Sequence, residues 1–270
     1  MAYLDRNREL RCHPANLLEP AASALCVALN YFTDVPVSSK EKNAIEPPRG
    51  QFSLYAQRGD YHVIMETMLL TVDTRLKQMF PGMRSLLCVD TKPVAERTLA
   101  LQSGIGWLGK NTCVVSPAFG SWIFLGVLIT DLVLRGAELQ ESRCGDCTLC
   151  LDACPTGALV EPYLMDARRC VSYLTIEKRG EISREQHQGM GMSLFGCDIC
   201  QQVCPYNEAA TVSPQFMAES ECELVSMDLE KLAKISNRTF ERLTRGSTIN
   251  RCRPAGMRRN AAIALTNLSP

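Results

Sequence analysis

A run of four closely spaced cysteines constrains the fold and chemistry of this chain more than any other feature. It consists of Cys144, Cys147, Cys150 and Cys154 in the spacing C-x2-C-x2-C-x3-C, and Pro155 follows it. Bacterial ferredoxins hold iron–sulfur cubes with such a run, in which three cysteines bind one cube and the fourth binds its neighbour. Structural zinc also uses C-x2-C pairs and is the alternative. The complete run and its proline favour iron and sulfide.

A second run of cysteines repeats the pattern but lacks one ligand. It reads FGCDICQQVCPYN at residues 195–207 and contains Cys197, Cys200 and Cys204, while Leu194 stands where a first cysteine is expected. Each cube takes four thiolates, so two cubes need one ligand more than the two runs supply. The missing thiolate must come from elsewhere in the chain.

Cys170 lies between the two runs, in the segment DARRCVSYLTIEKRG, and is the most economical eighth ligand. The alternatives lie outside the cluster region and are Cys12, Cys26, Cys88, Cys113, Cys222 and Cys252. Several of these have apolar, strand-like neighbours, as buried structural thiols do. We therefore predict two cubes, one bound by Cys144, Cys147, Cys150 and Cys204 and the other by Cys154, Cys170, Cys197 and Cys200.

The composition is that of a folded protein, with 46% hydrophobic and 21% charged residues among 270. Lys+Arg and Asp+Glu are both 29, so the net charge identifies no partner. No apolar run reaches the roughly 18 residues of a membrane span, and the opening MAYLDRNRELRCHP has no apolar core of a secretory signal. We expect a cytoplasmic protein with no membrane contact, whose cysteines stay reduced and serve as ligands.

The first part of the chain has the strand and helix signals of an α/β (α+β) fold. Apolar residues recur about one helical turn apart at Ile64, Met68, Val72 and Leu76. The run at 121–129 is apolar on both of its alternating faces, as in a strand buried between two layers. The predicted strands are 24–32, 85–90 and 121–129, and the predicted helices are 60–80 and 93–103.

The composition changes near Arg143, where the cysteine-rich segment with its proline and glycine breakers begins. A third region has a helical pattern and ends on an apolar face made by Ala261, Ala264, Leu265 and Leu268. We therefore predict three domains, which are an α/β domain at 1–143, a double [4Fe-4S] ferredoxin-type domain at 144–210 and a helical region at 211–270.

Three stretches of the sequence together resemble the epoxyqueuosine reductase family. They read LCVDTKPVAERTLALQSGIGWLGKN, CGDCTLCLDACPTGALVEPYLMDARRCVSYLTIEKRG and FGCDICQQVCPYN. The resemblance covers the whole chain and is dense from 86 to 207. It implies an enzyme with two [4Fe-4S] clusters and cobalamin that reduces epoxyqueuosine at the wobble position of tRNA to queuosine. The epoxide oxygen leaves as water, and the cofactor performs the redox step.

Asp90, in the VDT motif, matches the proton donor of the family. It follows a predicted buried strand, at the kind of position where α/β sites open. We expect burial to raise the pKa of its carboxyl, so that it holds a proton near neutral pH. If the family resemblance is left aside, the alternative is that Asp90 only caps the following turn.

The resemblance also implies which residues border cobalamin. Val114, Ser172, Cys197 and Asp198 match family positions beside the cofactor. The glycine-rich GIGWLGKN at 104–111 borders the corrin in the family, although taken alone it indicates only a tight turn. The three histidines, His13, His62 and His187, lie outside any D-x-H-x-x-G motif and are interpreted as ordinary surface or turn residues.

Seven arginines against the single acid Glu241 make 238–259 a candidate phosphate-binding segment. They are Arg238, Arg242, Arg245, Arg251, Arg253, Arg258 and Arg259. A solvated helical face is the alternative, and the tRNA substrate of the family favours binding. Arg179, at a family position, is a further candidate tRNA contact. The resemblance further implies an external electron donor such as flavodoxin or ferredoxin, and we expect a monomer.

Two other classes of protein share some of these features. A two-cluster electron-transfer protein needs neither Asp90 nor the GIGWLGKN segment. A corrinoid reductive dehalogenase uses the same cofactors but generally has a twin-arginine signal, which this sequence does not contain. Family members have further α/β sequence before MAYL and continue past RRNAAIALTNL into paired HEAT-like helices. We therefore expect Met1 to match an internal position of longer relatives and Pro270 to fall at the start of a HEAT-like region.

Overall fold

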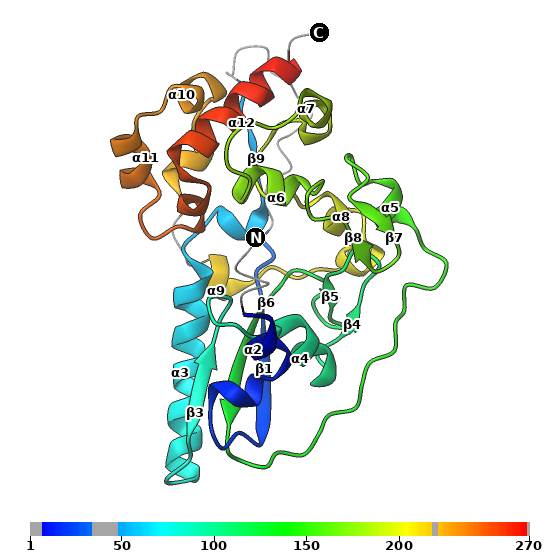
Figure 1. The fold of residues 1–270 in the computed structure, drawn as a ribbon, viewed down its shortest axis with the longest axis vertical. Helices are drawn as coiled ribbons and strands as arrows, with labels where there is room; N and C mark the ends of the chain where they lie inside the picture. The colour runs from blue at the N-terminus through cyan, green and yellow to red at the C-terminus, as the bar shows by residue number, and fades with distance from the viewer. Residues whose placement is uncertain (1–6, 34–47, 218–220, 269–270) are drawn as a thin grey trace. The chain divides into compact units, whose positions relative to one another are not determined.

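A computed structural model describes residues 7–33, 48–217 and 221–268 of the chain (Figure 1). The expected positions of Met1 and Pro270 in longer relatives lie outside these residues. The chain forms two compact units, and each contains two segments of the sequence. Unit 1 comprises Met1–Asn30 and Tyr61–Asp146, and unit 2 comprises Tyr31–Asp60 and Cys147–Pro270.

A three-stranded antiparallel sheet forms the centre of unit 1. Its strands are β1 (Ser23–Asn30), β6 (Ile123–Thr130) and β3 (Ser85–Cys88), with β6 in the middle. Thr130 of β6 stands opposite Ser23 on one side and Ser85 on the other. All three predicted strands are therefore confirmed. Because the sheet is antiparallel, unit 1 is of the α+β type, which agrees with the predicted α/β (α+β) fold class.

Helix α3 (Tyr61–Met79) packs on one face of this sheet, as the prediction for 60–80 required. Gly126 of β6 lets the helix approach, because a Cβ there would lie 2.8 Å from the Met65 side chain. The buried stripe is Met65, Leu69 and Asp73, one residue away from the predicted stripe. Asp73 is buried because its carboxylate accepts from Ser85 Oγ at 2.5 Å and from Lys77 Nζ at 2.8 Å.

The other face of the sheet is covered by α4 (Glu96–Gln102) and by Leu17 of η1 (Pro14–Leu17), and α2 (Arg8–Cys12) contacts η1. Val127 and Ile129 of β6 are buried in this second layer. The prediction that β6 lies between two layers is therefore confirmed. The short strands β4 (Trp107–Leu108) and β5 (Val114–Val115) form a hairpin after α4.

Unit 2 begins earlier in the sequence than the cysteine runs predicted. Strand β2 (Gln51–Phe52) pairs in parallel with β9 (Ser193–Phe195), and Ser53 N donates to Phe195 O at 2.8 Å. Phe52 is buried in the same core as Leu194. These contacts place 31–60 in unit 2, although we had included that segment in the first domain.

The rest of unit 2 combines short cluster-region elements with a helical region. The former are α5 (Leu149–Asp152), β7 (Leu159–Glu161), β8 (Leu164–Met165), α6 (Val171–Ile176), α7 (Arg184–Met190), α8 (Ile199–Gln202) and η3 (Pro205–Asn207). The latter are α9 (Pro214–Met217), η4 (Glu223–Ser226), α10 (Leu229–Ala233), α11 (Asn237–Leu243), η5 (Thr248–Cys252) and α12 (Arg253–Leu268), and η2 (Leu54–Ala56) joins them from the earlier segment.

Helix α12 is the common support of unit 2 (Figure 1). It packs against α10 in the helical region and against β9, α7 and α6 in the cluster region. Ala261 and Ala264 are fully buried in the larger core, and Ile263 belongs to the core around α6. The predicted ranges 144–210 and 211–270 therefore fall in one compact unit, apart from residues 144–146, which belong to unit 1. Among the described residues, no helix has the length and apolarity to span a bilayer.

Candidate active site and cluster-binding segments

Asp90 lies on a strained loop immediately after β3. Its φ of 44° is in the left-handed region, which few residues other than glycine adopt. Thr91 N donates to Val89 O across this tight turn, and Lys92 Nζ donates to Leu87 O at 2.5 Å. The turn directs the Asp90 side chain outward, and it is 67% exposed. Our expectation that this carboxyl is buried was therefore wrong.

His62 is the partner of Asp90. Its Nε2 lies 3.3 Å from Asp90 Oδ2, and its side chain is 24% exposed. The imidazole stacks on Tyr61 with ring centroids 4.1 Å apart, and Tyr61 stacks on Phe124 of β6 at 4.4 Å. The interpretation of His62 as an ordinary surface residue was wrong, because a three-ring stack anchors it to the sheet. No local sequence pattern marks this pair.

Glu96, the first residue of α4, lies close to the Asp90 loop. Burial raises the pKa of its carboxyl, the Asp90 charge raises it further, and a hydrogen bond from the Asp90 amide lowers it. Its Oε1 is buried and has no hydrogen-bond partner among the described residues. Arg11, on α2, lies close enough to lower the same pKa and donates to Val94 O at 3.0 Å. The sequence analysis did not identify Glu96.

The GIGWLGKN segment is a helix end followed by a hairpin. Gly104, with φ of 71°, follows the last turn of α4. A Cβ at Gly106 would collide with the Val115 carbonyl, so only glycine permits this approach of the two strands. Val114, predicted beside cobalamin, is 4% exposed and pairs with Leu108 in the hairpin. The tight turn indicated by the sequence is confirmed.

The two cysteine runs, which belong to unit 2 except for Cys144, fold as a structural repeat. In the first, Ala153 N donates to Leu149 O at 3.0 Å, and in the second Val203 N donates to Ile199 O at 3.2 Å. Each run places the second cysteine of the pattern C-x2-C-x3-C-P, Cys150 or Cys200, in its short helix, α5 or α8, and the two helices pack against each other. Such a pair is the arrangement of a double-cluster domain.

Four thiols of unit 2 influence one another electrostatically. Burial raises the pKa of Cys170, and the nearby Cys200 and Cys154 raise it further. Burial raises the pKa of Cys197 to about 12, and Cys200 and Cys170 again contribute. All four are free, partly buried cysteines. These electrostatic effects connect Cys170 with Cys154, Cys197 and Cys200, the thiols predicted to share one cube.

Backbone amides point at these sulfurs. Ala158 N lies 3.2 Å from Cys154 Sγ. Burial raises the pKa of Cys154, but the amides of Leu159, Thr156 and Ala158 outweigh it, so the pKa is lowered. Amides also reach the sulfurs of Cys170 and Cys197. Donors of this kind stabilise the thiolates of iron–sulfur clusters, so the chemistry of these segments fits such a group.

Of the residues predicted beside cobalamin, Ser172, Cys197 and Asp198 belong to unit 2 and Val114 belongs to unit 1. Gly196 N donates to Thr175 Oγ1 at 3.0 Å and so ties the segment before Cys197 to the helix that carries Ser172. The Asp198 carboxylate accepts from Leu54 N at 2.7 Å. Burial raises the pKa of Asp198, and the Leu54 amide and the Ser53 hydroxyl lower it.

Several arginines predicted to bind RNA instead form hydrogen bonds or ion pairs within unit 2. Arg179 donates to the carbonyls of Ile176 and Arg251 at 2.8 and 2.9 Å. Arg259 donates to three carbonyls, and Arg258 donates to that of Ile235. Arg251 pairs with Glu177 at 2.7 Å. The more exposed remainder consists of Arg238, Arg242, Arg245 and Arg253.

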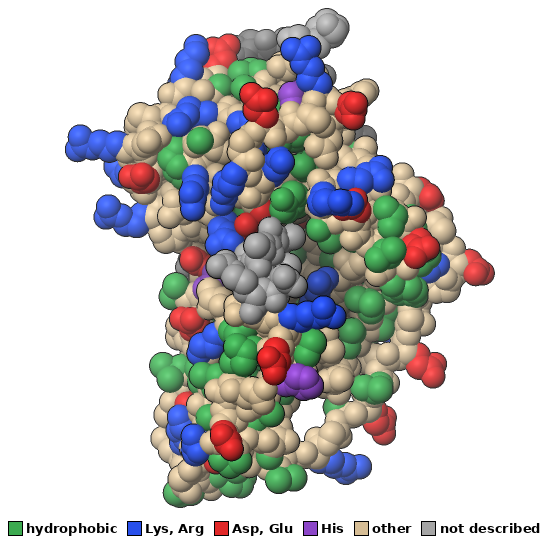
Figure 2. Space-filling model, viewed as in Figure 1, with side chains coloured by type: hydrophobic (Ala, Val, Ile, Leu, Met, Phe, Trp, Pro, Cys, Tyr) green, Lys and Arg blue, Asp and Glu red, His purple; other side chains and the backbone are tan. Residues whose placement is uncertain are grey.

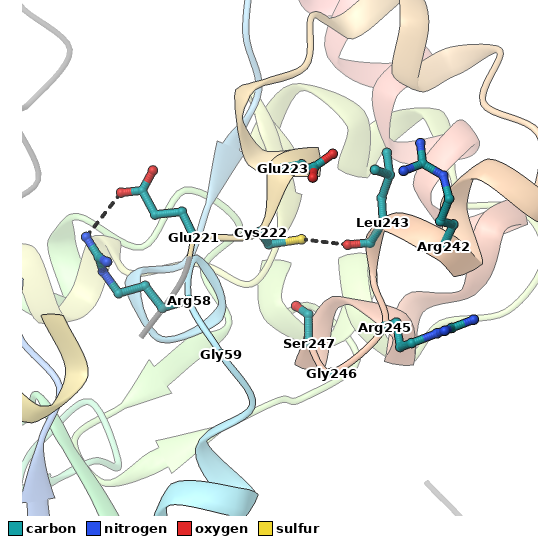
Figure 3. A pocket seen from close by; sticks show the side chains of 10 residues that line it. All are labelled: Arg58, Gly59, Glu221, Cys222, Glu223, Arg242, Leu243, Arg245, Gly246 and Ser247. Atoms are coloured by element: carbon teal, nitrogen blue, oxygen red, sulfur yellow. Dashed lines mark hydrogen bonds and ion pairs between the residues drawn. The ribbon is translucent and has the colours of Figure 1, made fainter. Parts of the chain in front are cut away.

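The helical region presents a basic surface and a polar pocket. On the face drawn in Figure 2, Lys and Arg side chains gather over the part of unit 2 that holds α10, α11 and α12. Arg242 and Arg245 also line a pocket of about 380 Å³ (Figure 3). Its wall contains the Arg58–Glu221 ion pair at 3.1 Å and the buried thiol of Cys222.

The α+β unit and the repeated cysteine segments define an oxidoreductase with a double iron–sulfur domain. Residues 143–207 match the family model of the 4Fe-4S double cluster binding domain, and residues 11–91 match that of "Epoxyqueuosine reductase QueG, DUF1730". The chain is 38% identical to the epoxyqueuosine reductase of Synechocystis over 91% of its own length and 83% of the relative. The Vibrio cholerae enzyme is 36% identical over 99% of this chain and 72% of the relative. The chain belongs to the epoxyqueuosine reductase family.

Solved structures agree with this membership. Epoxyqueuosine reductase from Bacillus subtilis, with its aspartate-bearing catalytic loop swung out of the active site, superimposes with a TM-score of 0.86 at 33% identity, over 96% of this chain and 68% of that one. An epoxyqueuosine reductase solved with an epoxyqueuosine-modified tRNA stem loop gives 0.84 at 31% identity, over 98% and 74%.

Proposed function

We propose that this chain reduces epoxyqueuosine in tRNA to queuosine, with two [4Fe-4S] clusters and cobalamin as cofactors. The observation that carries the proposal is its likeness, over 98% of its length, to an epoxyqueuosine reductase solved with epoxyqueuosine-modified RNA. Two electrons and two protons enter, both carbon–oxygen bonds of the epoxide break, an alkene forms and water leaves. Cobalamin, when bound, supplies the strongly reducing chemistry that this step needs.

Asp90 is the proton donor to the departing oxygen. Its exposed carboxyl stands on a loop that a left-handed residue turns outward, and His62 supplies a second proton-carrying group at 3.3 Å. An acid near a base of this kind delivers a proton and recovers it by way of its partner. The swung-out aspartate loop of the Bacillus subtilis relative supports a role for movement of this loop.

The two clusters relay single electrons through unit 2. One is held by Cys154, Cys170, Cys197 and Cys200, whose thiols influence one another's pKa. The other is held by Cys144, Cys147, Cys150 and Cys204. In this assignment each run supplies thiolates to both cubes, as in two-cluster ferredoxins. The packing of α5 against α8, which brings the two runs together, supports it. An external donor such as flavodoxin or ferredoxin supplies the electrons.

Val114, Ser172, Cys197 and Asp198 border cobalamin. The short side chain of Ser172 and the partly buried Cys197 suit the edge of a large macrocycle. Because the Asp198 carboxylate is held by Leu54 N, this residue meets the cofactor through its backbone. Its side chain then keeps the segment after β2 in place beside the second cysteine run.

The tRNA meets the helical region, which begins a HEAT-like RNA-binding segment. Arg238, Arg242, Arg245 and Arg253 are the phosphate contacts, because their side chains are exposed. Arg179 donates to carbonyls of α6 and η5. It contributes to tRNA binding by holding the backbone near this surface in place. The protein acts as a monomer.

Anaerobic reconstitution tests the proposal. The purified chain is loaded with iron, sulfide and cobalamin and assayed on tRNA carrying epoxyqueuosine, with nucleoside analysis of the product. We expect about eight irons per chain, corrin uptake and conversion to queuosine. Clusters without corrin uptake indicate an electron-transfer protein. Corrin uptake with dehalogenation and no queuosine indicates a reductive dehalogenase. Bound zinc in place of iron rejects both cluster assignments.

A further inference from the structure

Asn260 is a fully buried amide at the centre of unit 2. It lies on α12 and is 0% exposed. Its Nδ2 donates to Thr175 O of α6 at 2.9 Å and to Leu194 O of β9 at 2.8 Å. One side chain thus joins three elements that are far apart in the sequence. A buried donor needs such partners, because an unsatisfied amide in the interior is costly.

The two acceptor carbonyls lie on the segments that lead to cluster thiols. Cys170 is the N-cap of helix α6, and Thr175 lies in that same short helix. Leu194 lies in β9, three residues before Cys197. The same segments are also joined directly, because Gly196 N donates to Thr175 Oγ1 at 3.0 Å. Asn260 and Thr175 therefore fix the spacing between the backbone around Cys170 and the backbone around Cys197.

The amide of Asn260 has one possible orientation. Its Oδ1 accepts from Arg259 Nε at 3.1 Å and from Nη2 at 2.9 Å. Arg259 has no acceptor atoms, so Nδ2 must face the two carbonyls. The same guanidinium donates to Leu174 O at 2.7 Å, which adds a second link to α6. Both donors and the acceptor of the amide are thus used.

We propose that Asn260 is a positioning residue for the cluster bound by Cys154, Cys170, Cys197 and Cys200. It sets the separation of the Cys170 and Cys197 thiolates by holding their two segments to α12. The inference rests on the proposed ligand set. It extends that set by assigning the geometry of one cluster to a side chain that touches neither thiol.

Asn267 provides a matched control on the same helix. Its Nδ2 also donates to two carbonyls, those of His187 and Gly191, at 2.7 and 2.8 Å. These acceptors hold α7 and the turn after it, and neither belongs to α6 or β9. If Asn260 served packing alone, Asn260→Ala and Asn267→Ala would both lower stability, and neither would change the properties of one cluster specifically.

The test compares these variants after anaerobic reconstitution. We expect Asn260→Ala to lose up to half of the iron, or to keep it with altered paramagnetic resonance and midpoint potential of one cluster. Asn267→Ala keeps wild-type spectra and potentials. Unchanged spectra and potentials in Asn260→Ala overturn the inference, as do equal changes in both variants. Wild-type protein without cluster iron instead rejects the proposed function, and the inference falls with it.

Thr175 gives a second test if Asn260→Ala does not fold. Thr175→Val conserves the shape and removes the hydroxyl that accepts from Gly196 N. Thr175→Ser keeps that hydroxyl. We expect the valine variant to shift the spectrum of the same cluster and the serine variant to restore it. A valine variant with wild-type spectrum and potential contradicts the positioning network.

Discussion

His62 Nε2 lies 3.3 Å from Asp90 Oδ2, although the two residues are 28 positions apart and belong to different elements. The imidazole is anchored by aromatic stacking to the sheet, whereas the carboxyl stands on a strained loop. This arrangement places a second proton-carrying group beside the carboxyl that we propose as the proton donor.

Replacing either member of this pair separates their roles. We expect Asp90→Asn to lower single-turnover rates by roughly 10²- to 10⁴-fold, the usual range for loss of a general acid. His62→Phe retains an aromatic ring for stacking on Tyr61 and removes the nitrogen. It should give a smaller loss of single-turnover rate than Asp90→Asn. Both variants should retain wild-type iron and corrin contents, and an unchanged rate in His62→Phe contradicts the pairing.

Glu96 offers a prediction about the loop backbone. Glu96→Gln keeps an oxygen that accepts from the Asp90 amide, whereas Glu96→Ala removes it. Because the Glu96 carboxyl lies beside the Asp90 loop, we expect slower turnover in the alanine variant. The glutamine variant should stay closer to wild type. Single-turnover rates and thermal unfolding are the measurements, and equal rates in both variants contradict this role.

The arginines of the helical region should divide into two groups. Arg242→Ala and Arg245→Ala remove exposed charges, so each should reduce the slope of log affinity against log salt by about 0.7–0.9. Arg259→Ala removes hydrogen bonds to Leu174 O of α6 and to the carbonyls of Lys178 and Gly180, and should mainly lower the unfolding temperature. Filter binding of tRNA over a salt series tests the division. An unchanged slope in both surface variants contradicts phosphate binding.

The sequence predicted most of the cluster region because its chemistry is local. The spacing of cysteines and the following prolines determine the turns around a cube, so both runs and Cys170 were identified. The strands of the sheet were also predictable, since each is a short apolar run bounded by polar residues. The resemblance to a family supplied Asp90 and the residues that we propose beside cobalamin.

The remaining features depend on contacts between distant residues. His62 and Glu96 acquire their roles only when α3 and α4 pack beside the Asp90 loop. The arginine run looked uniform, but the carbonyls that accept from Arg259 lie in α6 and just after it, about 80 residues away. Segment 31–60 joined unit 2 through the pairing of β2 with β9, which no local pattern indicates.

The buried thiol of Cys252 predicts a pH dependence of stability. It is 1% exposed, and its Sγ lies 3.3 Å from Ile249 O. Burial raises its pKa to about 12 from an ordinary value of 9.0, and the charges of Arg179 and Arg259 offset part of this effect. The folded chain therefore keeps this proton at pH values where the unfolded chain releases it.

Between these two pKa values the folded state binds more protons than the unfolded state, so raising the pH favours unfolding. We expect this thiol to lower the unfolding free energy by up to about 1.4 kcal/mol per pH unit above 9.0, and to have no such effect below it. Anaerobic denaturant titrations at about pH 8 and about pH 10.5 measure the slope. Cys252→Ala should flatten it, while Cys12→Ala, which removes an exposed thiol, should not. Equal slopes in wild type and Cys252→Ala contradict the prediction, because the slope then arises from other groups.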